Sequence, residues 1–364
     1  MNRSHCFTHF FALAIFLNFV VIINSKDILF LLPLATKSHK NVFEPLYKAL
    51  ADRGHNVTVV SPVHPKGNYT NVREIVPVPY DDLIPDFPNP FERRKSGRLT
   101  TTMAANVNLL LPACERIYSV PEFVDLINHK FDLVFLNGFA NDCFAGVVYK
   151  IGSPFIMMVS MAPPNYIASL VGNHLPPSFV PFTMLPFTDE MNLIQRTANF
   201  VMNVAVGGIM WWSYGSLDEI ARKHLGSDLP SISEIEKNVS MILTNSYFPL
   251  TYSRPLLPDI VEVGGMHCRP AKSLPKELDD FLSGAEEGFI YFSMGSVVDT
   301  DLMPEDTRRK FLNAFKRLKQ RVVWKWNSGK MDDLPANVRV NKWLPQQDIL
   351  GNSLLLAYLP IVSF

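Results

Sequence analysis

The sequence has no excess of charge of either sign. Its 364 residues carry 34 basic and 34 acidic side chains, and charged residues make up only 19% of the chain. A nucleic-acid binder needs a basic excess to neutralise phosphates, and a disordered chain needs high net charge with low hydrophobicity. The zero net charge argues against the first class, and the 48% of hydrophobic residues excludes the second. The length indicates about two domains.

Cysteine is also scarce. The four cysteines are Cys6, Cys114, Cys143 and Cys268, and they form neither a Cys-x-x-Cys pair nor a Cys/His spacing typical of zinc sites. Cys6 lies in a leader that we expect to be removed, which leaves an odd number. We therefore expect neither a disulfide scaffold nor a metal site.

Long apolar runs are few, and the first one lies at the N-terminus. Phe10 to Ile23 is apolar except for Asn18, follows Arg3 and precedes the small residue Ser25. The run is shorter than the ~20 residues that a membrane span needs. We interpret residues 1–25 as a secretory signal peptide, with an N-terminal anchor as the alternative. The endoplasmic reticulum lumen is then the expected compartment, and glycosylation sequons begin at Asn56, Asn68 and Asn238.

A second apolar stretch, Phe200 to Trp212, is interrupted by Asn203, Gly207 and Gly208. It is too short for a span, so the pattern favours a core helix or a helix at a membrane surface.

Strand and helix patterns alternate along the chain. Asp27–Leu32 is predicted as a buried strand, Asn41–Arg53 has apolar residues at helical spacing, and Val57–Val60 is a β-branched run. A strand–helix–strand unit with short joints indicates a parallel sheet in a Rossmann-like α/β domain. Residues 33–39 contain no Gly-x-Gly-x-x-Gly, which excludes a dinucleotide-dependent dehydrogenase of the usual kind.

A similar unit follows later in the chain. Phe289–Ser293 and Val322–Trp326 are predicted strands, and Pro304 opens the helix between them. Prolines at 249, 255 and 258 mark a linker. We therefore predict an N-terminal domain over residues 26–255 and a second Rossmann-like domain over residues 256–350.

Several motifs resemble the UDP-glycosyltransferases, in particular the lumenal animal branch that includes the glucuronosyltransferases. They are FSMGS at 292–296, VVWKW at 322–326, KWLPQQDILG at 342–351, SHKNVFEPLYKALADRGHNVTVVSP at 38–62 and VGGMHCRPAKSLP at 263–275. The resemblance implies a GT-B fold, in which the N-terminal domain binds the acceptor and the C-terminal domain binds the UDP-sugar. It also implies catalysis without a metal or other cofactor, the UDP-sugar being a co-substrate.

The resemblance assigns the catalytic base to His39, which is predicted in the loop between the first strand and the first helix. Imidazole suits this role because its pKa lies near neutrality. Asp142 resembles the carboxylate that orients the base in the arthropod members, although it could equally cap a helix. Asn137 stands where mammalian and plant members have this carboxylate, and it could hold the imidazole by a hydrogen bond.

On the donor side, the resemblance assigns the uracil-stacking role to Trp343 and nucleoside binding to Gln346. Gly295 and Ser296 match the turn that approaches the phosphates, where glycine lets the backbone come close. The proline-rich stretch 163–186 is the expected acceptor region, because acceptor pockets are mostly apolar.

The last residues, 351–364, differ from the family pattern. The family continues into a His-Gly-Gly turn and further sugar-binding residues, whereas here the segment is apolar, with an unbroken run from Leu354 to Leu359. We therefore expect a truncated C-terminal domain, an aberrant tail and impaired activity.

The preferred function is transfer of a hexosyl or glucuronosyl group from a UDP-sugar to the hydroxyl of a small lipophilic acceptor. The alternative is a non-catalytic lumenal chain that binds acceptors or regulates full-length homologues. Expected partners are the donor, the acceptor, a membrane surface contacted peripherally and homologous glycosyltransferases, with no nucleic acid. UDP binding would discriminate the two hypotheses, because the second needs only the N-terminal domain.

Overall fold

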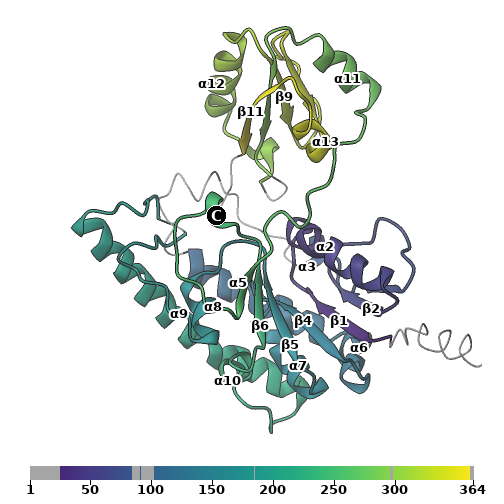
Figure 1. Ribbon diagram of the computed structural model, residues 1–364, viewed down its shortest axis with the longest axis vertical. Helices are drawn as coiled ribbons and strands as arrows, with labels where there is room; N and C mark the ends of the chain where they lie inside the picture. The colour runs from purple at the N-terminus through teal and green to yellow at the C-terminus, as the bar shows by residue number, and fades with distance from the viewer. Residues whose placement is uncertain (1–24, 84–90, 92–101, 184, 296–297, 361–364) are drawn as a thin grey trace, which may run out of the picture.

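The computed structural model describes residues 25–83, 91, 102–183, 185–295 and 298–360, with two α/β domains, one above the other in Figure 1. The larger domain holds a parallel sheet of seven strands in the order β3-β2-β1-β4-β5-β6-β7. These strands are β1 (Asp27–Leu31), β2 (Asn56–Val60), β3 (Val72–Ile75), β4 (Leu133–Asn137), β5 (Phe155–Val159), β6 (Met241–Thr244) and β7 (Ile260–Glu262). The order reverses between β1 and β4, which is where parallel α/β sheets bind ligands.

Helices cover both faces of this sheet. One face carries Phe30, Val59 and Phe135 and is covered by α2 (Lys37–Asp52), which contributes Phe43 and Tyr47. The opposite face packs against several helices, namely α3 (Tyr80–Leu83), α5 (Thr102–Tyr118), α6 (Pro121–Val124), α7 (Ala145–Ile151), α8 (Asn165–Ala168), α9 (Leu193–Leu225) and α10 (Ile232–Glu236). The central strands β1, β4 and β5 are buried on both sides, so their sequences are nearly all apolar, whereas the edge strand β3 carries Arg73 and Glu74.

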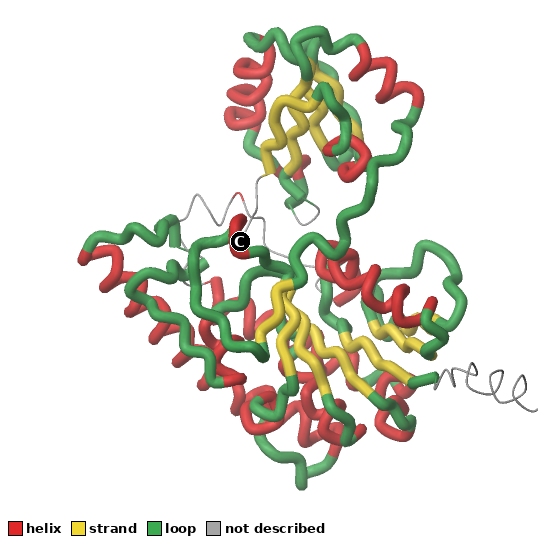
Figure 2. The backbone as a smooth tube through the Cα atoms, viewed as in Figure 1, coloured by secondary structure: helices red, strands yellow, loops and turns green. Residues whose placement is uncertain are grey.

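The smaller domain has four described parallel strands in the order β10-β9-β8-β11. They are β8 (Phe289–Ser293), β9 (Arg321–Lys325), β10 (Val338–Asn341) and β11 (Leu355–Pro360). Its helices are α11 (Lys276–Ser283), α12 (Glu305–Lys316) and α13 (Gln346–Leu350). Figure 2 shows the two sheets as separate layers, each flanked by helices. Short 3-10 helices, η1 (Asp125–Asn128), η2 (Asp142–Phe144), η3 (Ser169–Val171), η4 (Phe248–Leu250) and η5 (Thr300–Leu302), complete the described elements.

Two predicted boundaries are corrected. β7 pairs with β6 in register with Ile242↔Ile260, so the N-terminal domain continues beyond residue 255. The end of the chain is not an aberrant tail throughout, because β11 pairs in parallel with β8, with Leu359 opposite Phe292. The apolar run from Leu354 to Leu359 is thus the pattern of a sheet strand, and Tyr358 stacks on Tyr291 at a ring-centroid distance of 5.2 Å.

The longest helix, α9, was only partly indicated by the sequence. It begins with a capping box in which the side chain of Asn192 accepts from the backbone of Gln195 at 3.0 Å, and it ends before Gly226. Phe200–Trp212, predicted as a core or membrane-surface helix, lies within it. In the part of the chain that the structure describes, no helix has both the length and the apolar character needed to cross a bilayer.

Candidate functional site

His39 lies in the first turn of α2, not in the preceding loop as predicted. Thr36 caps the helix, and its Oγ1 accepts from the backbone N–H of His39 at 3.5 Å. The imidazole packs edge-on against the ring of Phe139, with centroids 5.4 Å apart. Burial lowers the pKa of His39 to about 4. The side chain is therefore neutral at physiological pH, which is the state that a general base needs.

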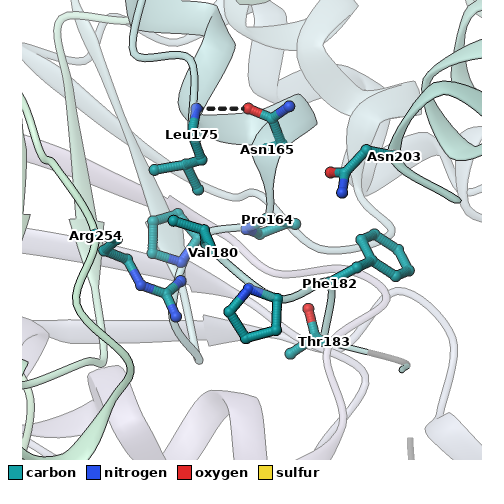
Figure 3. A pocket seen from close by; sticks show the side chains of 10 residues that line it. Pro164, Asn165, Leu175, Val180, Phe182, Thr183, Asn203 and Arg254 are labelled. Carbon is teal, nitrogen blue, oxygen red and sulfur yellow. Dashed lines mark hydrogen bonds between the residues drawn. The ribbon is translucent and has the colours of Figure 1, made fainter. Parts of the chain in front are cut away.

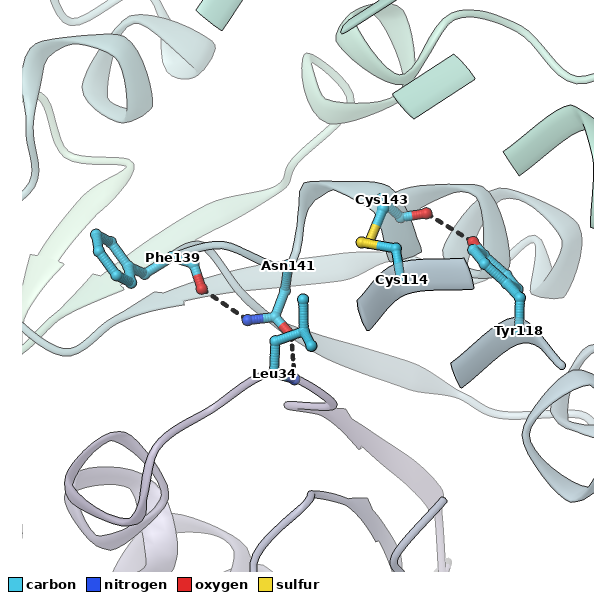
Figure 4. Close-up of a disulfide and its surroundings, with 6 residues drawn as sticks. All are labelled: Leu34, Cys114, Tyr118, Phe139, Asn141 and Cys143. Carbon is cyan, nitrogen blue, oxygen red and sulfur yellow. Dashed lines mark hydrogen bonds between the residues drawn. A yellow bond between two sulfur atoms is a disulfide. The ribbon is translucent and has the colours of Figure 1, made fainter. Parts of the chain in front are cut away.

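The loop after β4 is held to the loop after β1 by Asn141, which the sequence analysis did not single out. This buried amide accepts from the backbone N–H of Leu34 at 2.9 Å and donates to the carbonyl of Phe139 at 2.7 Å (Figure 4). Phe139 is the residue whose ring contacts His39. Asn137, also fully buried, makes longer hydrogen bonds to the backbone of Phe139. An asparagine shortly after a buried strand was the available signal for this role.

The structure does not join Asp142 to His39. Among the described contacts, the carboxyl of Asp142 interacts with that of Glu236, which is 1% exposed. The hydroxyl of Tyr214 donates to Glu236 Oε2 at 2.7 Å, and Tyr166 lies near both carboxyls. Burial raises the pKa of Asp142 and raises that of Glu236 well above its usual range. The predicted base–carboxylate pair is thus replaced here by a carboxyl–carboxyl pair at η2 and α10.

A disulfide between Cys114 and Cys143 fastens α5 to η2 beside Asp142 (Figure 4). The sequence alone does not predict this pairing, because nothing in a separation of 29 residues identifies the partner. Tyr118, one turn along α5, donates from its hydroxyl to the carbonyl of Cys143 at 2.6 Å. Cys268 is free and exposed. One covalent bond and one buried hydrogen bond therefore fix the start of η2.

Trp343, in the motif at residues 342–351, lies just before α13, and 59% of the surface of this residue is exposed. The ammonium of Lys37, from the first turn of α2, lies 3.9 Å from the centroid of the Trp343 ring. The helix that holds His39 therefore touches Trp343 of the other domain, which brings His39 and the predicted uracil platform to the same region.

Gln346 is the first residue of α13, and its Oε1 accepts from the hydroxyl of Tyr291 at 3.3 Å. Gly295 follows β8 with φ +78°, in the left-handed region that favours glycine. Apart from its chain neighbours, no described residue comes within 4 Å of the position of a Cβ on Gly295, so there is space beside this turn. Ser296 lies outside the described residues.

The interdomain segment anchors α13. Arg269 makes a two-pronged ion pair with Asp348, with distances of 2.6 and 3.1 Å, and the backbone N–H of Lys272 also donates to this carboxylate at 2.8 Å. These contacts hold the pKa of Asp348 below its usual range. Gln347 bonds to the backbone of His267 and Arg269. The residues after Trp343 are thus held by the connection between the domains.

The proline-rich stretch lines a small pocket of about 30 Å³ (Figure 3). Its lining residues are Pro163, Pro164, Asn165, Leu175, Val180, Pro181, Phe182, Thr183, Asn203 and Arg254.

Within the described ranges, no group of three or more His, Cys, Asp or Glu side chains is arranged to hold a metal ion.

Comparison of the architecture with solved structures identifies the GT-B fold. A glycotransferase of kitacinnamycin superposes with a TM-score of 0.57 at 14% identity, covering 93% of this chain and 76% of that one. The Medicago truncatula protein UGT71G1, solved with UDP-glucose, gives a TM-score of 0.56 at 13% identity, covering 93% and 76%.

The chain is also similar in sequence to curated UDP-glucosyltransferases and UDP-glucuronosyltransferases. The chain is 34% identical to UDP-glucosyltransferase 2 of Dactylopius coccus over 92% of this chain and 66% of the relative. It is 28% identical to human UDP-glucuronosyltransferase 1A6 over 88% and 63% of the two chains. The chain thus spans about two thirds of the length of these curated relatives. The family model described as "UDP-glucoronosyl and UDP-glucosyl transferase" matches residues 29–360, which includes β11, and the chain belongs to this family.

Proposed function

We propose that the chain acts as a UDP-glycosyltransferase, transferring a hexosyl or glucuronosyl group to the hydroxyl of a small lipophilic acceptor. The observation that carries this proposal is the meeting of two domains at one place: the turn of α2 that holds His39 also places Lys37 against Trp343. A base for the acceptor and an aromatic platform for the donor nucleoside therefore lie in the same region.

In the proposed reaction, the imidazole of His39 takes the acceptor's hydroxyl proton as the oxygen attacks the anomeric carbon of the sugar. The bond between that carbon and the diphosphate oxygen breaks, and its electron pair leaves with UDP. A single displacement inverts the anomeric centre. Burial keeps His39 neutral before the attack, and packing against Phe139 restricts the ring.

The nucleoside half of the donor is proposed to stack on Trp343, with Gln346 as its polar contact and Gly295 beside the phosphates. An exposed indole provides a flat apolar surface that suits a base without requiring a particular hydrogen-bond pattern. The pocket lined by the proline-rich stretch is the proposed entrance for the acceptor, and its lining mixes apolar side chains with the polar side chains of Asn165, Asn203 and Arg254.

UDP titration tests the donor half of this proposal. Trp343→Ala is expected to weaken UDP binding by about fivefold to a hundredfold, since base–aromatic stacking contributes ~1–3 kcal/mol. The matched control is Trp211→Ala, because Trp211 is also exposed but lies on α9. Transfer of sugar from UDP-glucose or UDP-glucuronate to a phenolic acceptor tests the chemistry. Absence of both UDP binding and transfer in the unaltered chain would contradict the proposal.

We also propose that the chain resides in the lumen of the secretory pathway. The disulfide between Cys114 and Cys143 supports this location, because such bonds persist in oxidising compartments. Protection of the chain from added protease in sealed microsomes, lost after detergent, is the expected result. Digestion in intact microsomes would place the chain on the cytosolic side and reject the proposal.

The outer face of α9 supports a further proposed partner, the surface of a lipid bilayer. Residues 197–217 contain no charged side chain, although one face of this stretch is open to solvent. The large exposed apolar side chains of the helix are Leu193, Ile194, Phe200, Val201, Val204, Trp211 and Trp212. A helix that is apolar on its solvent face as well as its core face matches lipid better than water, and tryptophan favours the interface.

Flotation with phosphatidylcholine vesicles tests this contact. The double change of Trp211 and Trp212 to Ser is expected to reduce the bound fraction severalfold, because both indoles are more than half exposed. Leu302→Ser provides the control, since Leu302 is half exposed on the other domain. Equal flotation of all three proteins would exclude α9 as the lipid contact.

A further inference from the structure

Lys37 occupies the place that the proposed function assigns to a nucleotide base. Its ammonium lies 3.9 Å from the centroid of the Trp343 ring, and Lys37 precedes His39 by two residues in the same helical turn. A cation over an indole gains ~0.5–1 kcal/mol at an exposed site, which a stacking base can replace. This contact is therefore one that ligand binding can exchange for another.

The surroundings of this ammonium are positive. Burial and the nearby charge of Lys66 both lower the pKa of Lys37, and Lys37 in turn contributes to lowering that of Lys325. The positive charge of Lys325 is partly balanced by Asp299 and Asp301, which lie near it, and its Nζ donates to Asn327 Oδ1 at 2.8 Å. In the described part of the chain, no carboxylate pairs with Lys37. The positive charge of Lys37 beside Trp343 and His39 thus has no paired carboxylate among the described residues.

We propose that Lys37 binds the diphosphate of the donor, so that the acceptor-binding domain supplies a cation to the departing UDP. When the base stacks on Trp343, the ammonium must leave the ring face. Lysine has a long flexible stem and three rotatable donors, so it can move from the ring to the adjacent phosphate oxygens. An anion at that point also relieves the repulsion among Lys37, Lys66 and Lys325.

This inference rests on the proposed function and adds a residue that joins its two halves. The sugar's anomeric carbon is bonded to the diphosphate, and His39 must lie near the acceptor that attacks that carbon. A cation two residues before His39 is consequently close to the bond that breaks. As the electron pair moves to the diphosphate oxygen, the ammonium of Lys37 bound to the diphosphate stabilises the leaving group without a proton transfer.

Comparison of UDP with uridine separates a diphosphate contact from a contact with the base. NMR titrations of both ligands would use the unaltered chain, Lys37→Met, Lys37→Arg and the control Lys48→Met. Lys48 lies on the same helix and pairs with Glu44 at 2.6 Å. Lys37→Met is expected to weaken UDP about tenfold to a hundredfold, the effect of losing one charge-assisted hydrogen bond. Uridine affinity is expected to change less than about threefold, and Lys37→Arg to retain most of the UDP affinity because the charge remains.

The other possible results of these titrations test the role of Lys37. Equal weakening of UDP and uridine by Lys37→Met would show a structural role, and tighter UDP binding would show that Lys37 only competes for the ring; both overturn the inference. Unchanged UDP binding in Lys37→Met also overturns it while leaving the proposed function intact. If the unaltered chain binds neither ligand, the proposed function and this inference fail together.

Discussion

The side chain of Asn141 accepts a hydrogen bond from the backbone N–H of Leu34 at 2.9 Å, across the point where the strand order of the large sheet reverses. Its amide nitrogen donates to Phe139, whose ring packs on His39. One buried amide thus sets the spacing between the loop that leads into α2 and the loop that packs on the imidazole of His39.

Asn141→Ala should therefore lower both stability and activity. The change leaves a buried N–H on Leu34 without its partner, which costs about 1–3 kcal/mol in the free energy of unfolding. Urea denaturation measures this cost, and Asn128→Ala is the control because Asn128 is an exposed residue bonded to Asp125. Equal midpoints for the two variants would show that Asn141 is not a structural bridge.

The kcat/KM of the transfer reaction should depend on pH less than is usual for an enzyme with a histidine base. Since the pKa of His39 is lowered to about 4, the imidazole stays neutral as pH falls through 6.5, and kcat/KM should be flat between pH 5 and pH 7. His39→Ala should lower turnover on alcohol acceptors by about 10²–10⁴. A fall in kcat/KM of the unaltered chain, centred near pH 6.5 as the pH is lowered, would contradict the buried, neutral state of the imidazole.

The Asp142–Glu236 pair should make stability depend on pH in the opposite way to an ordinary ion pair. Because the pKa of Glu236 is raised in the folded state, the folded chain keeps a proton that the unfolded chain releases above about pH 4.5. Stability contributed by this group is full below that pH and declines as pH rises toward the folded-state pKa. Glu236→Gln cannot ionise and should lose less unfolding free energy between pH 5 and pH 8 than the unaltered chain.

Glu234→Gln is the matched control for this measurement, because Glu234 is exposed on the same short helix. Glu234→Gln should have the same unfolding free energy as the unaltered chain at both pH values.

Asp142→Asn should reduce transfer less than His39→Ala and more than Asn137→Ala if Asp142 assists the base. The reverse order of the two smaller effects would move that role to Asn137, whose amide contacts the backbone of Phe139.

Removal of the disulfide should destabilise the N-terminal domain. Loop-closure entropy for a separation of 29 residues predicts a loss of about 3–4 kcal/mol on changing Cys114 and Cys143 to Ser. The free, exposed Cys268 offers the control, and Cys268→Ser should leave the denaturation midpoint unchanged. A double variant as stable as Cys268→Ser would mean that the bond does not form in solution.

Local patterns were sufficient for much of the fold. β2 and β8 were predicted nearly to their ends, because short apolar or β-branched runs between turns are typical of strands buried on both faces. The full length of α9 was missed, since its outer face is also apolar and gives no amphipathic period. β11 was read as an aberrant tail because its run departs from the family motif, although apolar runs suit a strand equally well.

The sequence by itself determined the family and the two α/β domains, because these depend on local motifs and hydrophobic pattern. Only the tertiary structure decided which side chains meet. It joined Asp142 to Glu236, Cys114 to Cys143, and Lys37 to Trp343. Such contacts connect residues far apart in the chain, and their existence depends on how strands and helices pack, which no local pattern encodes.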